Sequence, residues 1–293
     1  MSAPARQTAP RLETRPLTWA LGMEVLNFDI AQPADDDTIA EIAELVANNG
    51  ILLFRGQKMT PEQHIAFARR FGPSAPTPGV ARYLLKGYPE LFVVANRDED
   101  GNLLETAETA RQWHSDHSFT PKPAIGSILY CRQMPETGGT TMYTNMYRAY
   151  ETLSEPFKKM IEGMRAIHDV NNVAQLKNRK PRSQEELDST PPVSQPMVIT
   201  HPVSGRKALY VSEMFTRQIE GMTEEESRPI LDYLFAHSVR PEFTYRHQWK
   251  VDDVIFWDNR VVMHYAPRDY DPYDEKNWRY MLRATVDPVD KAF

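Results

Sequence analysis

The second half of the chain is dominated by short apolar runs that are separated by long polar connections. The runs are rich in β-branched and aromatic residues, which favour strands. They are I-G-S-I-L-Y-C (125–131), K-A-L-Y-V (207–211), F-T-Y-R-H-Q-W (243–249), D-V-I-F-W (253–257), V-V-M-H-Y (261–265) and Y-M-L-R-A-T-V (280–286). Many short strands with long connections predict a β-barrel or a double sheet. The expected fold class is therefore mainly β (α+β), with helices buttressing the sheets.

Capping signals place helices beside these strands. In T-P-E-Q-H-I-A-F-A-R-R-F-G (60–72), Thr60 and Gln63 form a capping box and Gly72 ends the helix. A second amphipathic helix over 36–49 precedes the apolar run I-L-L-F (51–54), which we expect to be a buried strand. Two more helices begin at Ser154, with Phe157, Met160, Ile161 and Met164 on one face, and at Thr223, which forms a capping box with Glu226.

Composition limits the partners of the chain. With 293 residues, 41% of them hydrophobic, it has enough apolar material for one large domain, which we place at residues 12–293. A formal net charge of −6 gives no electrostatic reason for binding nucleic acid or an anionic membrane, so we expect a small-molecule partner. The single cysteine, Cys131, and the lack of a long apolar run favour the cytoplasm.

Two segments carry little structural signal. Residues 1–11 have no apolar stretch, and we expect a disordered N-terminus there. Residues 174–196 have almost no apolar periodicity and four prolines. They are expected to form a long loop, which is either a lid over a bound substrate or a solvated connection.

The segment Q-W-H-S-D-H-S-F (112–119) crowds titratable side chains together. In an extended segment His114 and Asp116 point to the same side, whereas His117 points the other way and is a poorer third ligand. His264, in an apolar run after the polar turn W-D-N-R, is the best third candidate because a buried imidazole needs a partner. Two histidines and a carboxylate suit non-haem Fe(II) with open positions, or a hydrolytic zinc. A polar turn and a hydrogen-bonded core histidine are the structural alternative.

Five motifs in order resemble those of one known enzyme family, and together they span roughly residues 12–287. They are W-H-S-D-H-S-F (113–119), P-E-T-G-G-T-T (135–141), H-P-V-S-G-R-K-A-L-Y-V (201–211), W-D-N-R-V-V-M-H-Y-A (257–266) and R-Y-M-L-R-A-T (279–285). The chain is similar in them to the taurine dioxygenase and chlorophenoxyacetate dioxygenase family of Fe(II)- and 2-oxoglutarate-dependent enzymes. The resemblance implies a double-stranded β-helix, or jelly-roll, core.

The resemblance also implies roles for individual residues. His114, Asp116 and His264 look like the iron ligands and the catalytic centre. Thr141 and Arg279 resemble the residues that bind the distal carboxylate of 2-oxoglutarate, and Trp257 resembles a tryptophan that lines that pocket. Arg283 is similar to the arginine that binds the anionic end of the substrate. The implied reaction consumes 2-oxoglutarate and O2 at Fe(II), hydroxylates the substrate and releases succinate and CO2. Relatives are often dimers or tetramers, which implies a homo-oligomer.

Departures from the family pattern bear on the substrate. Positions that bind taurine in the taurine enzyme correspond here to Thr77, Val80 and Ala110, so taurine is not the expected substrate. Val80 and Ala110, with Phe215 and Tyr83, suggest a more apolar pocket and an anion with an organic body. An aryloxyalkanoate-like carboxylate, with cleavage of its ether bond, is the substrate hypothesis. The alternatives are a zinc-dependent hydrolase on the same His/Asp/His site, or a non-catalytic β-helix protein that binds a metal or a carboxylate.

Overall fold

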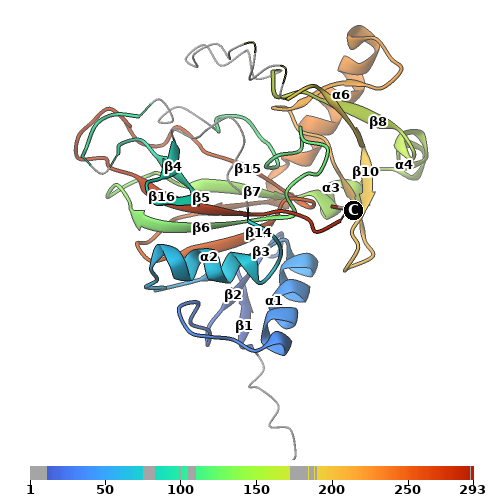
Figure 1. Ribbon diagram of the computed structural model, residues 1–293. Coiled ribbons are helices and arrows are strands. Elements are labelled where there is room, and N and C mark those ends of the chain that lie inside the picture. Colours follow the sequence, from blue (N-terminus) through green and yellow to red (C-terminus); the bar gives the residue numbers. More distant parts are fainter. Residues whose placement is uncertain are drawn as a thin grey trace, which may run out of the picture.

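The computed structural model describes residues 12–74, 83–98, 100–104, 110–171, 184, 188, 190–290, 292 and 293. Three expectations concern residues outside this set: the disordered N-terminus at 1–11, most of the lid at 174–196, and the substrate role of Val80. The described part is built around a large sheet that crosses the middle of the molecule (Figure 1).

The large sheet orders its strands β1-β2-β3-β14-β6-β16-β5-β4. Their bounds are β1 Thr14–Pro16, β2 Met23–Val25, β3 Ile51–Phe54, β14 Val254–Asp258, β6 Gly126–Gln133, β16 Tyr280–Val286, β5 Tyr88–Ala95 and β4 Leu84–Leu85. β2 and β3 pair in parallel, and the other neighbours are antiparallel. Every residue of β3 and β14 is buried, because both faces of the sheet are covered; this explains their continuous apolar runs.

Two helices, α1 (Asp36–Asn49) and α2 (Pro61–Arg69), lie along one face of this sheet (Figure 1). Both begin and end close to where the capping signals predicted. The Thr60 hydroxyl accepts from the backbone N–H of Gln63, and the Gln63 side chain accepts from the backbone N–H of Thr60. Apolar side chains of both helices pack against β3 and β14 in a first core.

A second sheet, ordered β13-β7-β15, covers the other face. Its strands are β13 Thr244–His247, β7 Thr141–Asn145 and β15 Val262–Tyr265. The core between the two sheets contains Tyr143 of β7, Trp257 of β14, Met263 of β15 and Met281 of β16. The expected mainly β architecture with buttressing helices is confirmed, and both cores share the large sheet.

The remaining elements lie beyond one end of the two sheets (Figure 1). They are α3 Met146–Glu151, α4 Glu155–Ile161, α6 Glu224–Ser238, the 3-10 helix Pro241–Phe243, and the strands β8 Arg165–His168, β9 Val193–Pro196, β10 Val198–Thr200, β11 Lys207–Leu209 and β12 Thr216–Ile219. These strands form two small sheets, ordered β12-β8-β9 and β10-β11.

Two local predictions need correction here. The loop expected at 174–196 ends earlier, because Val193–Pro196 form β9 and pair with β8. Pro196 is tolerated there because β9 is an edge strand of its sheet. The helix that begins after Ser154 ends at Ile161, so Met164 lies outside it and Met160 is 40% exposed. Of the apolar residues expected on its face, Ile161 alone is fully buried.

Candidate active site

An isolated antiparallel bridge brings His114 and His264 together although they are far apart in sequence. The backbone N–H of each donates to the carbonyl of the other, at 3.1 and 2.8 Å. Residues paired in this way present their side chains on one face of the sheet. Their imidazole centroids are 4.1 Å apart, and Asp116 completes the group because it lies two residues beyond His114.

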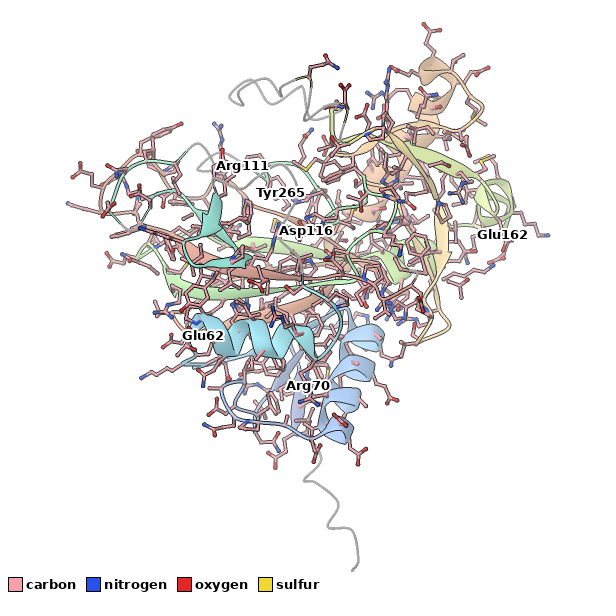
Figure 2. All side chains as sticks on the ribbon, in the orientation of Figure 1. Glu62, Arg70, Arg111, Asp116, Glu162 and Tyr265 are labelled. Carbon is pink, nitrogen blue, oxygen red and sulfur yellow. The ribbon has the colours of Figure 1, made fainter. Side chains whose placement is uncertain are left out.

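The three side chains offer a convergent set of ligand atoms. Nε2 of His114 lies 3.9 Å and Nε2 of His264 lies 4.0 Å from Oδ1 of Asp116. All three residues are buried, and their ligand atoms lie within 4.8 Å of one another. In the part of the chain that the structure describes, this metal cluster is the one group of histidines and acids with such geometry. In Figure 2, Asp116 lies above the large sheet, while Glu62 and Glu162 lie at the periphery.

Protonation in the cluster favours a cation. Nδ1 of His114 lies 2.8 Å from the carbonyl oxygen of Gln112, which can only accept, so Nδ1 carries the proton and Nε2 the lone pair. Burial, followed by the neighbouring His114, lowers the pKa of His264 to about 3, so this imidazole is neutral near neutral pH. Burial alone would raise the pKa of Asp116, but Arg283 and the two histidines hold it well below its usual range.

A buried polar shell orients Asp116. Ser127 of β6 donates its hydroxyl to Oδ2 of Asp116 at 2.8 Å. Asn259 donates to that Ser127 hydroxyl at 2.9 Å, and its side-chain oxygen accepts from the backbone N–H of Asp116 and from the indole of Trp257. Trp257 therefore lies beside the metal cluster, with its ring 4.9 Å from that of His264. Among the described residues, its hydrogen bond goes to Asn259 and its ring contacts go to Tyr143 and His264, not to Arg279 or Thr141.

Arg279 and Thr141 belong to a second buried polar group. The guanidinium of Arg279 donates from Nε to the carbonyl of Gly139 at 3.0 Å and from Nη2 to the hydroxyl of Thr141 at 3.3 Å. The Trp249 indole also donates to that hydroxyl, at 2.9 Å. Glycine is required at Gly138, since a Cβ there would lie 2.2 Å from a backbone oxygen. Arg279 is 8% exposed and Thr141 4%, so a bound carboxylate would be shielded from water.

Arg283 lies on the same face of the chain as Arg279, as residues four apart in a strand do. Its Nη1 donates to Oδ1 of Asp116 at 2.7 Å, and its guanidinium lies 5.0 Å above the ring of Phe92. Its Nε is buried without a partner in the described part of the chain, which leaves a donor for an anion. The ring of Tyr83 in turn packs at 5.9 Å from that of Phe92.

Phe215 and Ala110, the other described residues expected to contact the substrate, both lie near the metal cluster. The Phe215 ring packs edge-on against His114 at 5.8 Å and lies 4.8 Å from Phe119. With Met214 and Val170 these rings form an apolar wall. Ala110 is tied to this region through its backbone carbonyl, which accepts from the N–H of Ala266, two residues beyond His264.

His117 is not one of the three converging residues, but the extended alternation behind that prediction does not apply, because residues 116–119 form a turn. The chain turns there, with a φ of 56°. Burial lowers the pKa of this imidazole to about 4, and its ring packs 6.0 Å from Phe119. His117 therefore packs beside Phe119, next to the apolar wall of the site.

Three residues of the site have no sequence prediction: Ser127, Asn259 and Trp249. Asn259 stands inside the W-D-N-R motif, and Ser127 and Trp249 stand inside predicted strands, so their segments were identified. Their roles depend on contacts that span 11, 143 and 108 residues of sequence, which no local pattern contains.

The comparisons with known proteins agree with this geometry. A model described as taurine catabolism dioxygenase TauD, TfdA family matches residues 13–285. This chain belongs to that family. The alpha-ketoglutarate-dependent 2,4-dichlorophenoxyacetate dioxygenase of Cupriavidus pinatubonensis is 34% identical over 279 residues, which cover 92% of this chain and 94% of that protein.

Solved structures match the chain over nearly its whole length. AAD-2, crystallised in complex with Mn(II) and N-oxalylglycine, gives a TM-score of 0.81 at 32% identity, over 97% of this chain and 100% of that one. A taurine dioxygenase from Burkholderia xenovorans gives 0.77 at 32% identity, over 95% and 90%. The expected jelly-roll core is therefore confirmed.

The enzyme class is confirmed as well: the chain is a 2-oxoglutarate-dependent dioxygenase, an oxidoreductase. Enzymes of this class use Fe(II), 2-oxoglutarate and O2. The two imidazoles and the carboxylate of the metal cluster fit Fe(II), because they leave positions open for a chelating oxo acid and oxygen. Family membership decides against the zinc hydrolase and the non-catalytic binder. Within the described residues, no helix is long and apolar enough to cross a membrane.

Proposed function

We propose that this dioxygenase hydroxylates a small organic anion of the aryloxyalkanoate type. The observation that carries the proposal is the pair of arginines on one strand face. Arg279 points to the pocket of Thr141, while Arg283 reaches the metal cluster and lies over Phe92. Two cations on two sides of one centre suit two anions, a dicarboxylic oxo acid and a substrate carboxylate.

In this proposal His114, Asp116 and His264 hold the iron. Arg279 and Thr141 bind the distal carboxylate of 2-oxoglutarate, and Trp257 fixes the ring plane of His264. When bound, the iron centre supplies the oxidation: one oxygen atom enters the substrate as hydroxyl, and 2-oxoglutarate becomes succinate and CO2 with the other. The remaining work of the chain is to position the substrate and to exclude water.

Arg283 is the proposed anchor of the substrate. The ring of Phe92 packs against its guanidinium, and its Nε, which has no partner among the described residues, remains available to donate to an anion. An aromatic body would then pack on the wall that contains Phe215, with Ala110 and Val80 as further proposed contacts. If the hydroxylated carbon bears an ether oxygen, the product collapses to a phenol and a carbonyl compound. This cleaves the ether without a further oxidant.

The first experiment tests whether the metal cluster of this chain holds Fe(II) and 2-oxoglutarate. Fe(II) and 2-oxoglutarate are added without oxygen to metal-free protein, and the visible spectrum is recorded, with His114→Ala as control. A weak metal-to-ligand charge-transfer band that the variant lacks is expected. Absence of the band, together with tight zinc binding, would overturn the proposed use of the site.

The substrate is tested by succinate release. Aryloxyacetates and aryloxypropionates are compared with short alkylsulfonates, alkyl sulfates and taurine. We expect turnover of the aryloxy acids. Arg283→Met should weaken the binding of the aryloxy acid by a larger factor than it weakens the binding of 2-oxoglutarate. Equally rapid turnover of a short alkylsulfonate would refute the aryloxyalkanoate assignment. A cytoplasmic location and assembly as a dimer or tetramer complete the proposal, the latter tested by light scattering.

A further inference from the structure

The hydroxyl of Tyr143 is buried and has no hydrogen-bond partner among the described residues. Tyr143 is 0% exposed and lies in the middle of β7. A buried hydroxyl without a partner costs free energy, so its presence beside an active site requires an explanation. The pairing of the strands provides one.

Tyr143 stands between the two polar groups of the site. It shares a strand face with Thr141, two residues before it, and its register partner on β15 is His264. Its ring lies 6.4 Å from that of His264 and 5.8 Å from that of Trp257. The side chain therefore extends from the strand between the metal cluster and the Arg279 pocket.

The hydroxyl is available as a donor. Burial raises the pKa of Tyr143 well above its ordinary value, against the opposing influence of the Arg279 charge, so the hydroxyl keeps its proton. The Tyr143 side chain lies on the strand face that carries Thr141, whose hydroxyl accepts from Arg279, so the hydroxyl of Tyr143 belongs to the Arg279 end of the site.

Among the described residues, this end of the site presents donors, and its acceptor, the carbonyl of Gly139, is already engaged by Arg279. Both lone pairs of the Thr141 hydroxyl are directed at N–H groups, one of Trp249 and one of Arg279, so its own hydrogen remains to be donated. The Asp116 oxygens are already engaged by Ser127 and Arg283. Converging donors without an acceptor suit an anion.

We propose that the hydroxyl of Tyr143 donates to the distal carboxylate of 2-oxoglutarate, as a third donor beside Arg279 and Thr141. This inference rests on the proposed function of the site. It makes Tyr143 a specificity residue for dicarboxylic oxo acids, because an oxo acid without the second carboxylate would leave the hydroxyl unsatisfied.

The test measures binding without turnover. Dissociation constants of 2-oxoglutarate and of 2-oxopentanoate, which lacks the distal carboxylate, are determined from the charge-transfer band of the oxygen-free Fe(II) protein. Tyr143→Phe removes the hydroxyl alone, and it is expected to weaken 2-oxoglutarate about tenfold while changing 2-oxopentanoate by less than about twofold. Tyr210→Phe is the matched control, because it removes another buried, unpartnered hydroxyl and should change neither constant.

Each other outcome has a distinct meaning. An unchanged 2-oxoglutarate constant in Tyr143→Phe overturns the inference and leaves the proposed function standing. Equal weakening of both acids overturns it too, since the hydroxyl would then contact the metal-chelating end. Absence of a band in the unaltered protein refutes the proposed function and the inference together.

A second readout separates ligand binding from a structural role. The metal-free Tyr143→Phe protein should unfold within about 2 °C of the unaltered protein or above it, since no protein hydrogen bond is lost. A fall of more than about 5 °C would show that the hydroxyl already has a partner in the protein, and it would overturn the inference.

Discussion

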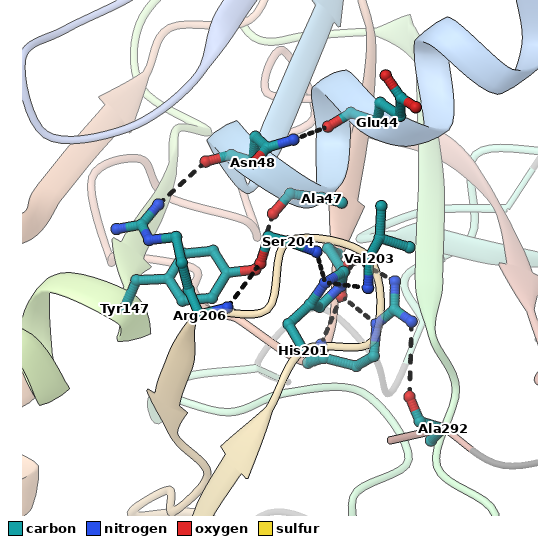
Figure 3. A network of polar contacts seen from close by, with 11 residues as sticks. Glu44, Ala47, Asn48, Tyr147, His201, Val203, Ser204, Arg206 and Ala292 are labelled. Atoms are coloured by element: carbon teal, nitrogen blue, oxygen red, sulfur yellow. Dashed lines mark hydrogen bonds and ion pairs between the residues drawn. The ribbon is translucent and has the colours of Figure 1, made fainter.

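Two buried groups of histidine, aspartate and arginine flank the same W-D-N-R turn, and they differ in what their atoms still lack. One is the metal cluster with Arg283. The other is the buried triad His201, Asp258 and Arg260, whose surroundings Figure 3 shows. Residue types and burial are nearly the same in both, so neither property identifies the active site.

The buried triad is saturated. Nδ1 of His201 accepts from the backbone N–H groups of Val203 and Ser204, so its proton is on Nε2 and is donated to Asp258 at 3.0 Å. Arg260 binds the same carboxylate through two guanidinium nitrogens and also donates to the carbonyl of Ala292 (Figure 3). These contacts tie the connection between β10 and β11 to the turn after β14 and to the end of the chain.

The metal cluster is not saturated. Nε2 of His264 lies beyond hydrogen-bond distance from Asp116, its Nδ1 has no partner in the described part of the chain, and neither has Nε of Arg283. The comparison teaches that a buried polar group with every atom paired stabilises the fold, whereas one with convergent unpaired atoms is built to receive a ligand.

The sharpest test of this contrast replaces one histidine of the metal cluster. His264→Leu removes a ligand, so Fe(II) binding should fall by more than the 10–100-fold that loss of an outer-shell partner costs, that is by about 1000-fold or more. The free energy of unfolding of the metal-free protein should change by less than about 1.5 kcal/mol, because no side-chain hydrogen bond is lost. Iron titration and urea denaturation measure the two quantities, and a large destabilisation would contradict the contrast.

The corresponding change in the buried triad should have the opposite result. His201→Leu leaves the N–H groups of Val203 and Ser204 without an acceptor and removes one of the donors to the buried Asp258, which should cost about 3–5 kcal/mol of unfolding free energy. Folded protein of this variant should still bind Fe(II) and 2-oxoglutarate. Loss of the charge-transfer band at unchanged stability would reverse the assignment of the two groups.

Some parts of the fold and of the site could be predicted from local sequence, and others could not. Thr60 with Gln63 and Thr223 with Glu226 mark helix starts through contacts three residues apart, so α2 and α6 were predictable from local chemistry. Arg283 of β16 and Arg279, just before β16, are four residues apart, and strand alternation is an equally local reason to expect them on one face. The roles of His114, Asp116 and His264, in contrast, came from the resemblance of whole motifs.

What the sequence did not reveal depends on long-range pairing. The bridge between His114 and His264, the placement of Tyr143 opposite His264, and the contact of Trp249 with Thr141 all follow from strand register across the two sheets. β9 was missed for the same reason, because its polar, proline-containing sequence forms a strand when β8 offers a backbone edge. Tertiary pairing overrides local propensity in these segments.

A buried histidine outside both groups shows the effect of burial alone on the pKa of an imidazole. His64 of α2 lies outside both groups, with the carbonyl of Ile128 at 3.0 Å from its Nε2, and burial lowers its pKa to about 4. Because the folded pKa is below the unfolded one, its contribution is present above about pH 6.5 and is lost as pH falls toward 4.

Replacement of His64 by phenylalanine should therefore reduce the fall in the free energy of unfolding as the pH is lowered. Between pH 6.5 and 4.5 the free energy of unfolding should fall by about 2–3 kcal/mol less in His64→Phe than in the unaltered protein, at up to about 1.4 kcal/mol per pH unit. Urea denaturation over this range measures the slope. Parallel curves would show that the pKa of this imidazole is the same in the folded and the unfolded protein.

The smallest expected effect concerns the hydrogen-bond partners of the two aspartates, the metal ligand Asp116 and the structural Asp258. Asp258 is held by arginine and histidine, whereas Oδ2 of Asp116 is held by one neutral hydroxyl, that of Ser127. Ser127→Ala should free the carboxylate to rotate and should weaken Fe(II) about tenfold. Ser115→Ala is the control: the Ser115 hydroxyl donates to the carbonyl of Val262, so its removal should leave iron affinity within about twofold. Equal losses in the two variants would mean that any nearby hydroxyl matters, and that the orientation of Asp116 comes from Asn259 and the backbone instead.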